Sequence, residues 1–289
     1  MMEEKKDLIY KINSFFKKMS KGQKLIANYI LNHYDKAAFM TASKLGEKVG
    51  VSESTVVRFA NVLGYEGYPQ LQKALQELIR NKLTLIQRIE MTSDLDQSMV
   101  LQSVLKADIN NIKMTLSEID INTFLTVVDK IFSAKRIYVL GIRSSAPLAQ
   151  FFGYYLNFIF PNVKIVTSGI SDVFEQLMRI TPDDILIGIS FPRYSRRTVE
   201  ALSFVKNKGA KVVAITDSLL SPLTSHADYT LIARSNISSF VDSMVAPASL
   251  INALLIALGL QKKNEIYSYF HDLEEIWDQY KVYLGKDKP

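Results

Sequence analysis

Two short segments of the chain combine hydroxyl side chains with arginines, a pattern typical of anion binding. One covers residues 140–147 (LGIRSSAP) and the other covers residues 188–198 (GISFPRYSRRT). Their candidate ligand-binding residues are Ser144, Ser145, Ser190, Arg193, Ser195 and Thr198. Hydroxyl and backbone N–H groups at a helix start suit a phosphate monoester, and guanidinium groups match a dianion or an added carboxylate.

The alternative explanation is structural, with serine and threonine capping helices and the arginines lying on a solvated face. For either segment alone, that explanation is the better one. Both segments, however, lie on neighbouring crossovers of one predicted sheet, so a shared anion pocket becomes about as good an explanation as the structural one.

Five short runs rich in β-branched residues predict strands at 137–141, 163–167, 184–190, 211–216 and 229–233. The segments 144–160, 170–180 and 197–208 are long enough for helices between the first four strands. Apolar strands that alternate with helices predict a parallel sheet covered on both faces. Ligands bind such sheets at the carboxyl ends of the strands, where both hydroxyl-rich segments lie.

The composition excludes several kinds of chemistry. The 289 residues are 48% apolar and 22% charged, which is typical of a folded chain long enough for two domains. The absence of cysteine excludes a disulfide framework, a thiolate metal site and a cysteine nucleophile, and fits a reducing cytoplasm. The three histidines (His33, His226 and His271) lie far apart, so we expect no metal centre and no cofactor. We also expect no secretory signal, because the first residues contain acids and no apolar core segment.

Residues 1–90 show a helical pattern with the spacing of a helix-turn-helix. One short helix fits between a cap at Thr41 and a stop at Gly50, and the next begins at Ser52. In this geometry the second helix enters the DNA major groove. The candidate DNA-binding residues are Thr41, Ser52, Ser54, Thr55 and Arg58. A plain helical bundle is the alternative, since any helical hairpin with glycine in its turn has similar spacing.

The predicted domain boundary follows a longer amphipathic helix that runs from about Pro69 towards Ile89. Residues 91–103 are more polar and lack a packing period, so we predict a linker there. The two domains would then cover residues 1–90 and 104–289.

The net charge of +6 lies entirely in the first predicted domain. Residues 1–90 hold 15 Lys and Arg against 9 Asp and Glu, whereas residues 91–289 hold 20 of each. A basic domain on a neutral body suits an anionic partner, either nucleic acid or a membrane surface, although ordinary surface charge explains the number equally well. Residues 144–163 and 243–261 contain no charged residue, but polar residues and prolines interrupt them. We expect these two stretches to be core helices rather than membrane spans.

Both halves of the sequence resemble the RpiR family of bacterial transcriptional regulators. SESTVVRFANVLG and LGYEGYPQLQKAL are similar to the family's DNA-binding half, and SSAPLAQ and ITDSLLSPLTSHADYTL to its sugar isomerase (SIS) domain. The resemblance implies an all-α helix-turn-helix domain followed by an α/β SIS domain with a five-stranded parallel sheet covered by helices on both faces. It also implies two partners: double-stranded operator DNA, and a small anionic effector that is a phosphosugar or a related metabolite.

The resemblance also assigns roles to the two hydroxyl-rich segments. The family's first phosphate loop corresponds to Ser144 and Ser145, and its second to Ser190, Ser195 and Thr198. This chain departs from the family pattern in both loops. A position that is often glycine is Arg143 here, and the usual SxSGxT-like second loop reads SFPRYSRRT.

Arg193 in the second loop follows Pro192, which restricts the backbone of the residue before it. An arginine on a stiff loop is well placed for bidentate anion binding. We therefore expect Arg193 to contact the ligand directly, with Arg143 and Arg196 as further candidates.

A catalytic phosphosugar isomerase is the competing function. Isomerisation needs a positioned base, and the nearby candidates are Glu175, Glu200 and His226. None has a visible partner in the sequence, and an isomerase would not need residues 1–90. We therefore favour the regulator and predict no catalytic residue; a membrane-surface protein is a third and weaker alternative.

We expect a homodimer or homotetramer formed through helices of the C-terminal half. Two-fold pairing lets a palindromic operator be read twice, whereas one helix-turn-helix makes few base contacts. The last predicted helix, at 264–283, carries Tyr269, Phe270 and Trp277 on one side. These rings either form an interface or pack on the chain's own sheet.

Overall fold

The computed structural model describes residues 8–80, 84–90, 96–169, 171–236 and 239–284. The chain divides into two compact units, Met1–Glu90 and Met91–Pro289. Each unit has its own set of buried apolar residues.

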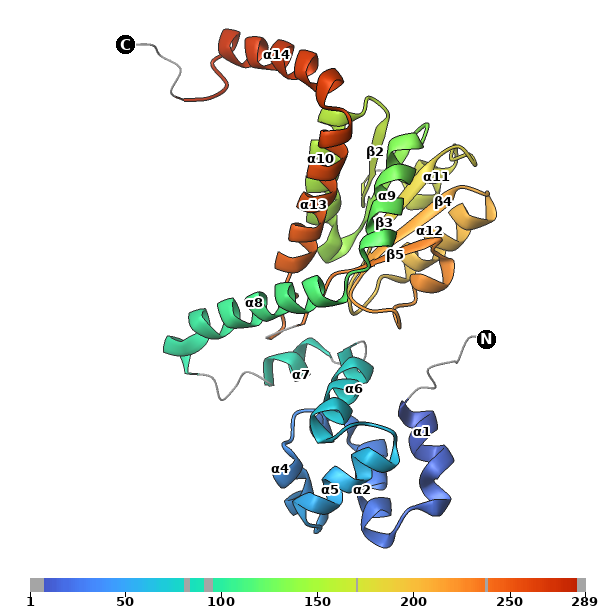
Figure 1. Ribbon diagram of the computed structural model, residues 1–289, viewed down its shortest axis with the longest axis vertical. Coiled ribbons are helices and arrows are strands. Elements are labelled where there is room, and N and C mark those ends of the chain that lie inside the picture. Colours follow the sequence, from blue (N-terminus) through green and yellow to red (C-terminus); the bar gives the residue numbers. More distant parts are fainter. Residues whose placement is uncertain (1–7, 81–83, 91–95, 170, 237–238, 285–289) are drawn as a thin grey trace. The chain divides into compact units, whose positions relative to one another are not determined.

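Helices account for all regular secondary structure in the described part of the N-terminal unit (Figure 1). They are α1 (Leu8–Phe15), the 3-10 helix η1 (Phe16–Lys18), α2 (Lys21–Asn32), α3 (Tyr34–Ala37), α4 (Ala42–Val49), α5 (Glu53–Val62), α6 (Tyr68–Arg80) and α7 (Leu85–Glu90). Ile26, Leu45, Phe59 and Leu71 are fully buried between them, as expected for helices with one apolar face.

The helix expected from Pro69 to Ile89 is instead two helices, α6 and α7. Residues 81–83, which separate them, lie outside the described residues. The apolar residues of the two helices have different environments, because Leu75 of α6 is fully buried whereas Ile86 of α7 is 71% exposed. The prediction of one helix was wrong, because the apolar spacing in the sequence continues past the last apolar residues of this segment that are buried in the core.

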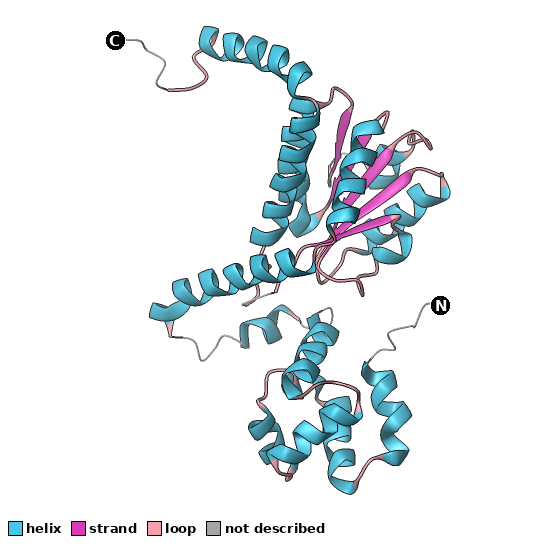
Figure 2. Cartoon of the chain, in the orientation of Figure 1, coloured by secondary structure: helices cyan, strands magenta, loops and turns pink. Residues whose placement is uncertain are grey.

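The C-terminal unit is an α/β domain in which helices alternate with parallel strands (Figure 2). Its strands are β1 (Ile137–Gly141), β2 (Val163–Val166), β3 (Ile185–Ile189), β4 (Lys211–Thr216) and β5 (Tyr229–Ile232). Its helices are α8 (Val100–Glu118), α9 (Ile121–Ser133), α10 (Ala146–Ile159), α11 (Val173–Leu177), α12 (Arg196–Asn207), α13 (Val245–Gln261) and α14 (Lys263–Gln279), with short 3-10 turns η2 (Gln97–Met99), η3 (Arg143–Ser145) and η4 (Thr224–His226). The strand order is β2-β1-β3-β4-β5, which confirms the predicted five-stranded parallel sheet.

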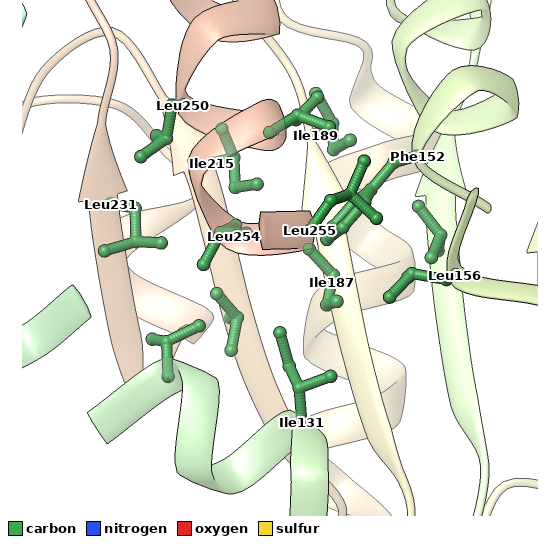
Figure 3. Close-up of a cluster of buried hydrophobic side chains, with 14 of the residues drawn as sticks. Ile131, Phe152, Leu156, Ile187, Ile189, Ile215, Leu231, Leu250, Leu254 and Leu255 are labelled. Atoms are coloured by element: carbon green, nitrogen blue, oxygen red, sulfur yellow. The ribbon is translucent and has the colours of Figure 1, made fainter. Parts of the chain in front are cut away.

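Alternate residues of the three inner strands, β1, β3 and β4, enter two separate cores. Ile137 and Val139 pack with α9, α10 and α13 on one face. Figure 3 shows part of this cluster, with Ile187 and Ile215 of the neighbouring strands labelled. Tyr138 and Leu140 pack with α11 and α12 on the other face. This two-faced burial explains why the strands are continuously apolar in sequence, and it confirms that helices cover both faces.

Part of the predicted linker at 91–103 is helical. Residues 91–95 lie outside the described residues, but η2 begins at Gln97 and α8 at Val100. Asp96 starts this helical segment by accepting a hydrogen bond from the Ser98 N–H at 3.0 Å. The apolar residues at the start of α8 do not face the core, since Leu101 is 70% exposed. That exposure explains why the segment lacked a packing period in the sequence.

No single helix among the described residues is long and apolar enough to cross a membrane. Val245–Gln261 and Ile266–Gln279 reach such a length and composition only together, as a pair bent by 109°. The two uncharged stretches of the sequence supply core residues through α10 and α13, as expected.

An ion pair between the half-buried Arg136 and the buried Asp184 joins the starts of β1 and β3 at the amino edge of the sheet. Arg136 donates to Asp184 from Nε at 3.0 Å and from Nη2 at 2.8 Å, and the Thr181 N–H and hydroxyl donate to the same carboxylate. Burial alone would raise the pKa of Asp184, but the hydrogen bonds from Arg136 and Thr181 outweigh it and hold this pKa below its usual value of 3.8. The carboxylate is therefore a stabilising anion that fixes the two strands beside each other.

We predict that Asp184→Asn lowers the free energy of unfolding of the C-terminal unit by about 1.5–3 kcal/mol, the range for a hydrogen bond to a charged group. Because the folded-state pKa is lowered, this contribution is present above the unfolded-state pKa and is lost as the pH falls through the folded-state pKa. Urea unfolding of both proteins at about pH 7 and about pH 3 measures the difference. The neighbouring exposed carboxylate allows a matched control, Asp183→Asn, which should change little at either pH. An Asp184→Asn deficit of equal size at both pH values would contradict the assignment.

Candidate DNA interface and effector site

A tight turn between α4 and α5 gives the N-terminal unit its helix-turn-helix. Gly50 ends α4 with a φ of 74°, in the left-handed region that favours glycine. At Gly46, a Cβ atom would lie 2.7 Å from the Val51 carbonyl oxygen, so only glycine lets the turn pack this closely on α4. Thr41 and Ser52 cap the two helices by accepting hydrogen bonds from the N–H groups of Lys44 and Thr55. These caps confirm the predicted helix starts.

The N-terminus of α5 presents a cluster of hydroxyl groups with one guanidinium. The Ser52 Oγ lies 2.9 Å from both Ser54 Oγ and Thr55 Oγ1. Arg58 lies one turn further on and donates from Nε and Nη2 to the carbonyl oxygen and hydroxyl of Ser54. Ser52, Ser54 and Arg58 are exposed, and their donors can contact phosphates and base edges.

The other two predicted DNA-binding residues are placed less favourably. Thr55 is half-buried, and its methyl carbon lies 3.4 Å from the position that a Cβ on Gly22 of α2 would occupy. Thr41 is exposed at the start of α4, and its hydroxyl bonds to the backbone of that helix rather than to the cluster on α5. Both hydroxyls therefore serve the fold of the motif.

Three polar side chains on α6 hold the segment before α4, and the sequence analysis did not identify them. The Tyr68 hydroxyl donates to the Met40 carbonyl at 2.7 Å, Gln72 donates to the same oxygen at 2.9 Å, and Gln76 donates to Ala38 at 3.1 Å. Burial raises the pKa of Tyr68 to about 12, so its hydroxyl is a donor at neutral pH. The signal in the sequence was the spacing of four residues between these side chains, which places them on one face of α6.

In the C-terminal unit, the first hydroxyl-rich segment follows β1. Gly141 ends the strand, and a Cβ there would lie 2.6 Å from the Ser145 carbonyl oxygen. The missing side chain lets the turn η3 fold directly onto the strand end. Ser145 is buried at the start of α10 and makes no side-chain capping bond, whereas Ser144 is exposed.

The second segment follows β3 and leads into α12. Ser190 is buried, and its Oγ accepts a hydrogen bond from the Ser195 N–H at 3.4 Å. Ser195 occupies the N-cap of α12 but makes no side-chain capping bond. Thr198, in the first turn of α12, is fully buried, and its hydroxyl has no hydrogen-bond partner. The start of α12 therefore holds polar groups whose hydrogen-bonding capacity the fold does not use.

These two segments lie side by side at the carboxyl edge of the sheet. Strands β1 and β3 are hydrogen-bonded neighbours, with Gly141 paired with Ile189. The helix after β1 packs on one face of the sheet and the helix after β3 packs on the other. A crevice opens at such a reversal of strand order, and it is where open α/β sheets bind ligands.

The arginines of the second segment differ in their contacts. Arg196 pairs with Glu200 at 2.7 Å, and Arg197 lies 3.5 Å from Asp172 and above the ring of Phe174. Arg193 is exposed and has a φ of 64°. Only Arg193 of these three keeps a guanidinium without an ion pair among the described residues.

Tyr194 anchors the second segment to the end of β4, a contact that the sequence analysis missed. Its hydroxyl donates to Oδ1 of the buried Asp217 at 2.6 Å. The Thr216 hydroxyl lies 3.3 Å from the same oxygen and 2.8 Å from the Ser221 hydroxyl. Asp217 and Ser221 belong to the segment ITDSLLSPL, which the sequence analysis used only for its family resemblance.

The candidate isomerase bases are poorly placed for catalysis. His226 lies in η4 ahead of β5, at the amino edge of the sheet and opposite the two segments. Glu200 pairs with Arg196, and Glu175 accepts the Asp172 N–H in the capping box of α11. Within the described residues, no group of three or more His, Asp or Glu side chains could hold a metal ion.

Comparison with known proteins matches both halves of the chain. The helix-turn-helix domain of the rpiR family matches residues 6–82, and the SIS domain matches residues 130–257. An HTH-type transcriptional regulator of Haemophilus influenzae is 29% identical over 236 residues, which cover 80% of this chain and 81% of the relative. The fold and these matches define a DNA-binding regulator that contains a SIS domain. The chain belongs to the RpiR family of transcriptional regulators, as the sequence predicts.

Two solved structures share this architecture. The sugar isomerase domain of an RpiR transcription factor from Sphaerobacter thermophilus has a TM-score of 0.59 and 28% identity, covering 61% of this chain and 99% of that chain. The NanR protein of Vibrio vulnificus, complexed with ManNAc-6P, has a TM-score of 0.58 and 19% identity, covering 96% of this chain and all of that chain.

Proposed function

We propose that the chain regulates transcription by binding operator DNA through α5 and by sensing a phosphosugar or a related anionic metabolite at the carboxyl edge of its sheet. The observation that carries the sensing proposal is the buried Thr198 hydroxyl, which has no partner. Leaving a buried hydroxyl unpaired costs about 1–3 kcal/mol, so a ligand oxygen that accepts from it recovers that cost.

The phosphate would bind at the N-terminus of α12. This helix is 12 residues long, and its first backbone N–H groups lack a side-chain cap. Cβ atoms tilt towards the start of a helix, which brings the Thr198 hydroxyl towards the same end. Ser190 and Ser195 add hydroxyl groups from the loop, and Ser144 and Ser145 add them from the neighbouring strand end. The NanR structure is a complex with ManNAc-6P, which supports a phosphosugar as the class of ligand.

Thr198→Val is the sharpest test of this phosphate site. Valine has nearly the same shape without the hydroxyl, so the variant without ligand should be at least as stable as the wild type. With inorganic phosphate or glucose 6-phosphate, the wild type should gain melting temperature and the variant should gain less. Loss of one hydrogen bond to a charged group predicts about 10- to 150-fold weaker binding, or roughly 1.5–3 kcal/mol.

The control is Thr126→Val, because that hydroxyl bonds to its own helix at Asn122. It should leave the ligand response of the protein unchanged. A wild-type response to phosphate compounds that persists undiminished in Thr198→Val would remove Thr198 from the site.

DNA binding would use the exposed donors at the start of α5. Ser52 and Ser54 lie at the positive end of the helix, where hydroxyl and N–H groups suit DNA phosphates. The hydrogen bonds from Arg58 to Ser54 fix the arginine along the helix, and its remaining N–H groups can contact guanine or phosphate. The charge excess of residues 1–90 supports this assignment.

We predict that Arg58→Ala costs about 1–3 kcal/mol of operator affinity if Arg58 contacts a base, or lowers the salt slope by about one if it contacts a phosphate. The probe is a duplex selected by the wild-type protein from a random library, titrated by gel shift at several salt concentrations. The control is Lys36→Ala. Lys36 is exposed and follows the C-terminal end of α2, whereas Gly22, which lies beside α5, is at the other end of that helix. Equal affinities and salt slopes in wild type and Arg58→Ala would exclude Arg58 from the interface.

We propose no catalytic role and no cofactor for this chain, and we place its activity in the cytoplasm. The two glutamates that an isomerase could use are held by a capping box and by an arginine pair. His226 lies at the opposite edge of the sheet from the proposed phosphate site.

We also propose that the protein is a homodimer or homotetramer that assembles through helices of the C-terminal unit. The aromatic side of α14 packs partly on α10, since Phe158 lies 6.1 Å from Phe270 and 6.5 Å from Trp277 between ring centroids. Phe270 nevertheless remains 43% exposed and Tyr269 45%.

A second apolar stripe lies on α8 and consists of Leu101, Leu105, Ile109, Ile112 and Leu116. At 3.6 residues per turn these five side chains fall within an arc of about 80°, which suits a helix partner.

Sedimentation of the wild type at micromolar concentration should show a dimer or tetramer. Leu105→Glu with Ile109→Glu places charge in the α8 stripe and should shift the protein towards monomer without unfolding it, because both side chains are exposed. Asn110→Glu with Ser117→Glu adds the same charge on the opposite side of α8 and should leave assembly unchanged. A wild type that sediments only as a monomer would contradict the proposal.

A further inference from the structure

Two arginines at the proposed effector site have an unusual backbone conformation. Only three described residues other than glycine have a positive φ: Arg143 at 56°, Arg193 at 64° and Lys281 at 51°. The left-handed region is unfavourable for a residue with a Cβ, and residues held there cluster at ligand sites. Two of the three thus occupy corresponding places, in the loops that follow β1 and β3.

The side chains of these two arginines are unpaired. Both are exposed, and among the described residues neither guanidinium makes a hydrogen bond or an ion pair. Arg136, Arg196 and Arg197 of the same unit all pair with carboxylates. Because β1 and β3 are adjacent strands about 4.8 Å apart, the two loops that carry these arginines are neighbours. An anion bound between the loops can pair with both guanidinium groups.

The loop around Arg193 is fixed on both sides. Pro192 is buried, and Tyr194 is held by its 2.6 Å hydrogen bond to Asp217. On the other loop, Ile142 is buried and its carbonyl accepts from the Ser145 N–H at 3.2 Å. These anchors fix the backbone of both loops in the strained conformation, so less backbone entropy is lost when a ligand binds.

The phosphate site does not need these arginines. Two of its proposed side-chain donors, Ser190 and Thr198, are buried, whereas Arg143 and Arg193 are exposed. The arginines therefore lie outside the phosphate site, where the rest of the ligand would extend. The planar guanidinium fork matches a carboxylate in two-point contact.

We propose that Arg143 and Arg193 bind a carboxylate on the same ligand, so that the effector is a phosphorylated sugar acid rather than a phosphosugar that lacks a carboxylate. This inference rests on the proposed phosphate site at α12. It assigns the two departures from the family's glycine-containing loops to recognition of a second anionic group.

The test compares ligand pairs that differ only in a carboxylate replacing a hydroxymethyl group. The pairs are 6-phosphogluconate with glucitol 6-phosphate, and 3-phosphoglycerate with glycerol 3-phosphate; calorimetry measures the affinity of the full chain for each. We expect the carboxylated member of at least one pair to bind at least tenfold more tightly. If no carboxylated member binds more tightly than its partner, the proposal is wrong even where phosphate compounds bind.

Arg143→Gly and Arg193→Gly locate the effect. Glycine adopts a positive φ without strain, so each variant removes the side chain and keeps the loop. Each should reduce the preference for the carboxylated member at least tenfold while changing the affinity for its partner less than twofold. Arg196→Ala, which removes a paired arginine from the same loop, should leave the preference unchanged. Glycine variants that keep the wild-type preference would overturn the proposal.

Failure of the proposed function gives a different result. In that case the wild type binds none of the four compounds and does not respond to inorganic phosphate, and the carboxylate proposal fails with it. Binding of both members of each pair with equal affinity, in contrast, leaves the phosphate site standing and removes only the carboxylate.

Discussion

The parallel pairing of β1 with β3 determines where every proposed ligand-binding residue of the C-terminal unit lies. Because the strands run in the same direction, their carboxyl ends meet at one edge, and the loops that follow them become neighbours. The helices after the two strands pack on opposite faces of the sheet. At the other end, the Arg136–Asp184 ion pair holds the same two strands together.

The donors at this edge are left unused by the fold. Ser195 does not cap α12, Ser145 does not cap α10, and the buried Thr198 hydroxyl has no partner. Elsewhere in the chain the serine and threonine caps are made, as at Ser20, Thr41 and Ser52. Buried polar groups are normally hydrogen-bonded, so an unpaired hydroxyl at the carboxyl edge of the sheet points to a ligand. In the N-terminal unit, Ser52 caps its helix and also belongs to the hydroxyl cluster at the start of α5.

Local chemistry made much of this structure predictable from the sequence. Strand positions were predicted within one residue at each end, since β-branched runs between turn residues define them locally. Gly50 and Ser52 marked the turn between α4 and α5 for the same reason. Contacts between distant segments were not predictable: Tyr194 with Asp217, Tyr68 with Met40, and Arg197 with Asp172 each join residues with no shared local pattern. The hydroxyl-rich loops were identified as candidates, but only the structure distinguishes the paired Arg196 from the unpaired Arg193.

The most direct test of the phosphate site is a crystal structure of the full chain with the phosphosugar that raises its melting temperature most in a screen. The account predicts a phosphate group at the N-terminus of α12, within hydrogen-bond distance of the Thr198 hydroxyl and of the first N–H groups of that helix. A phosphate bound away from α12, with the Thr198 hydroxyl still unpaired, would contradict it.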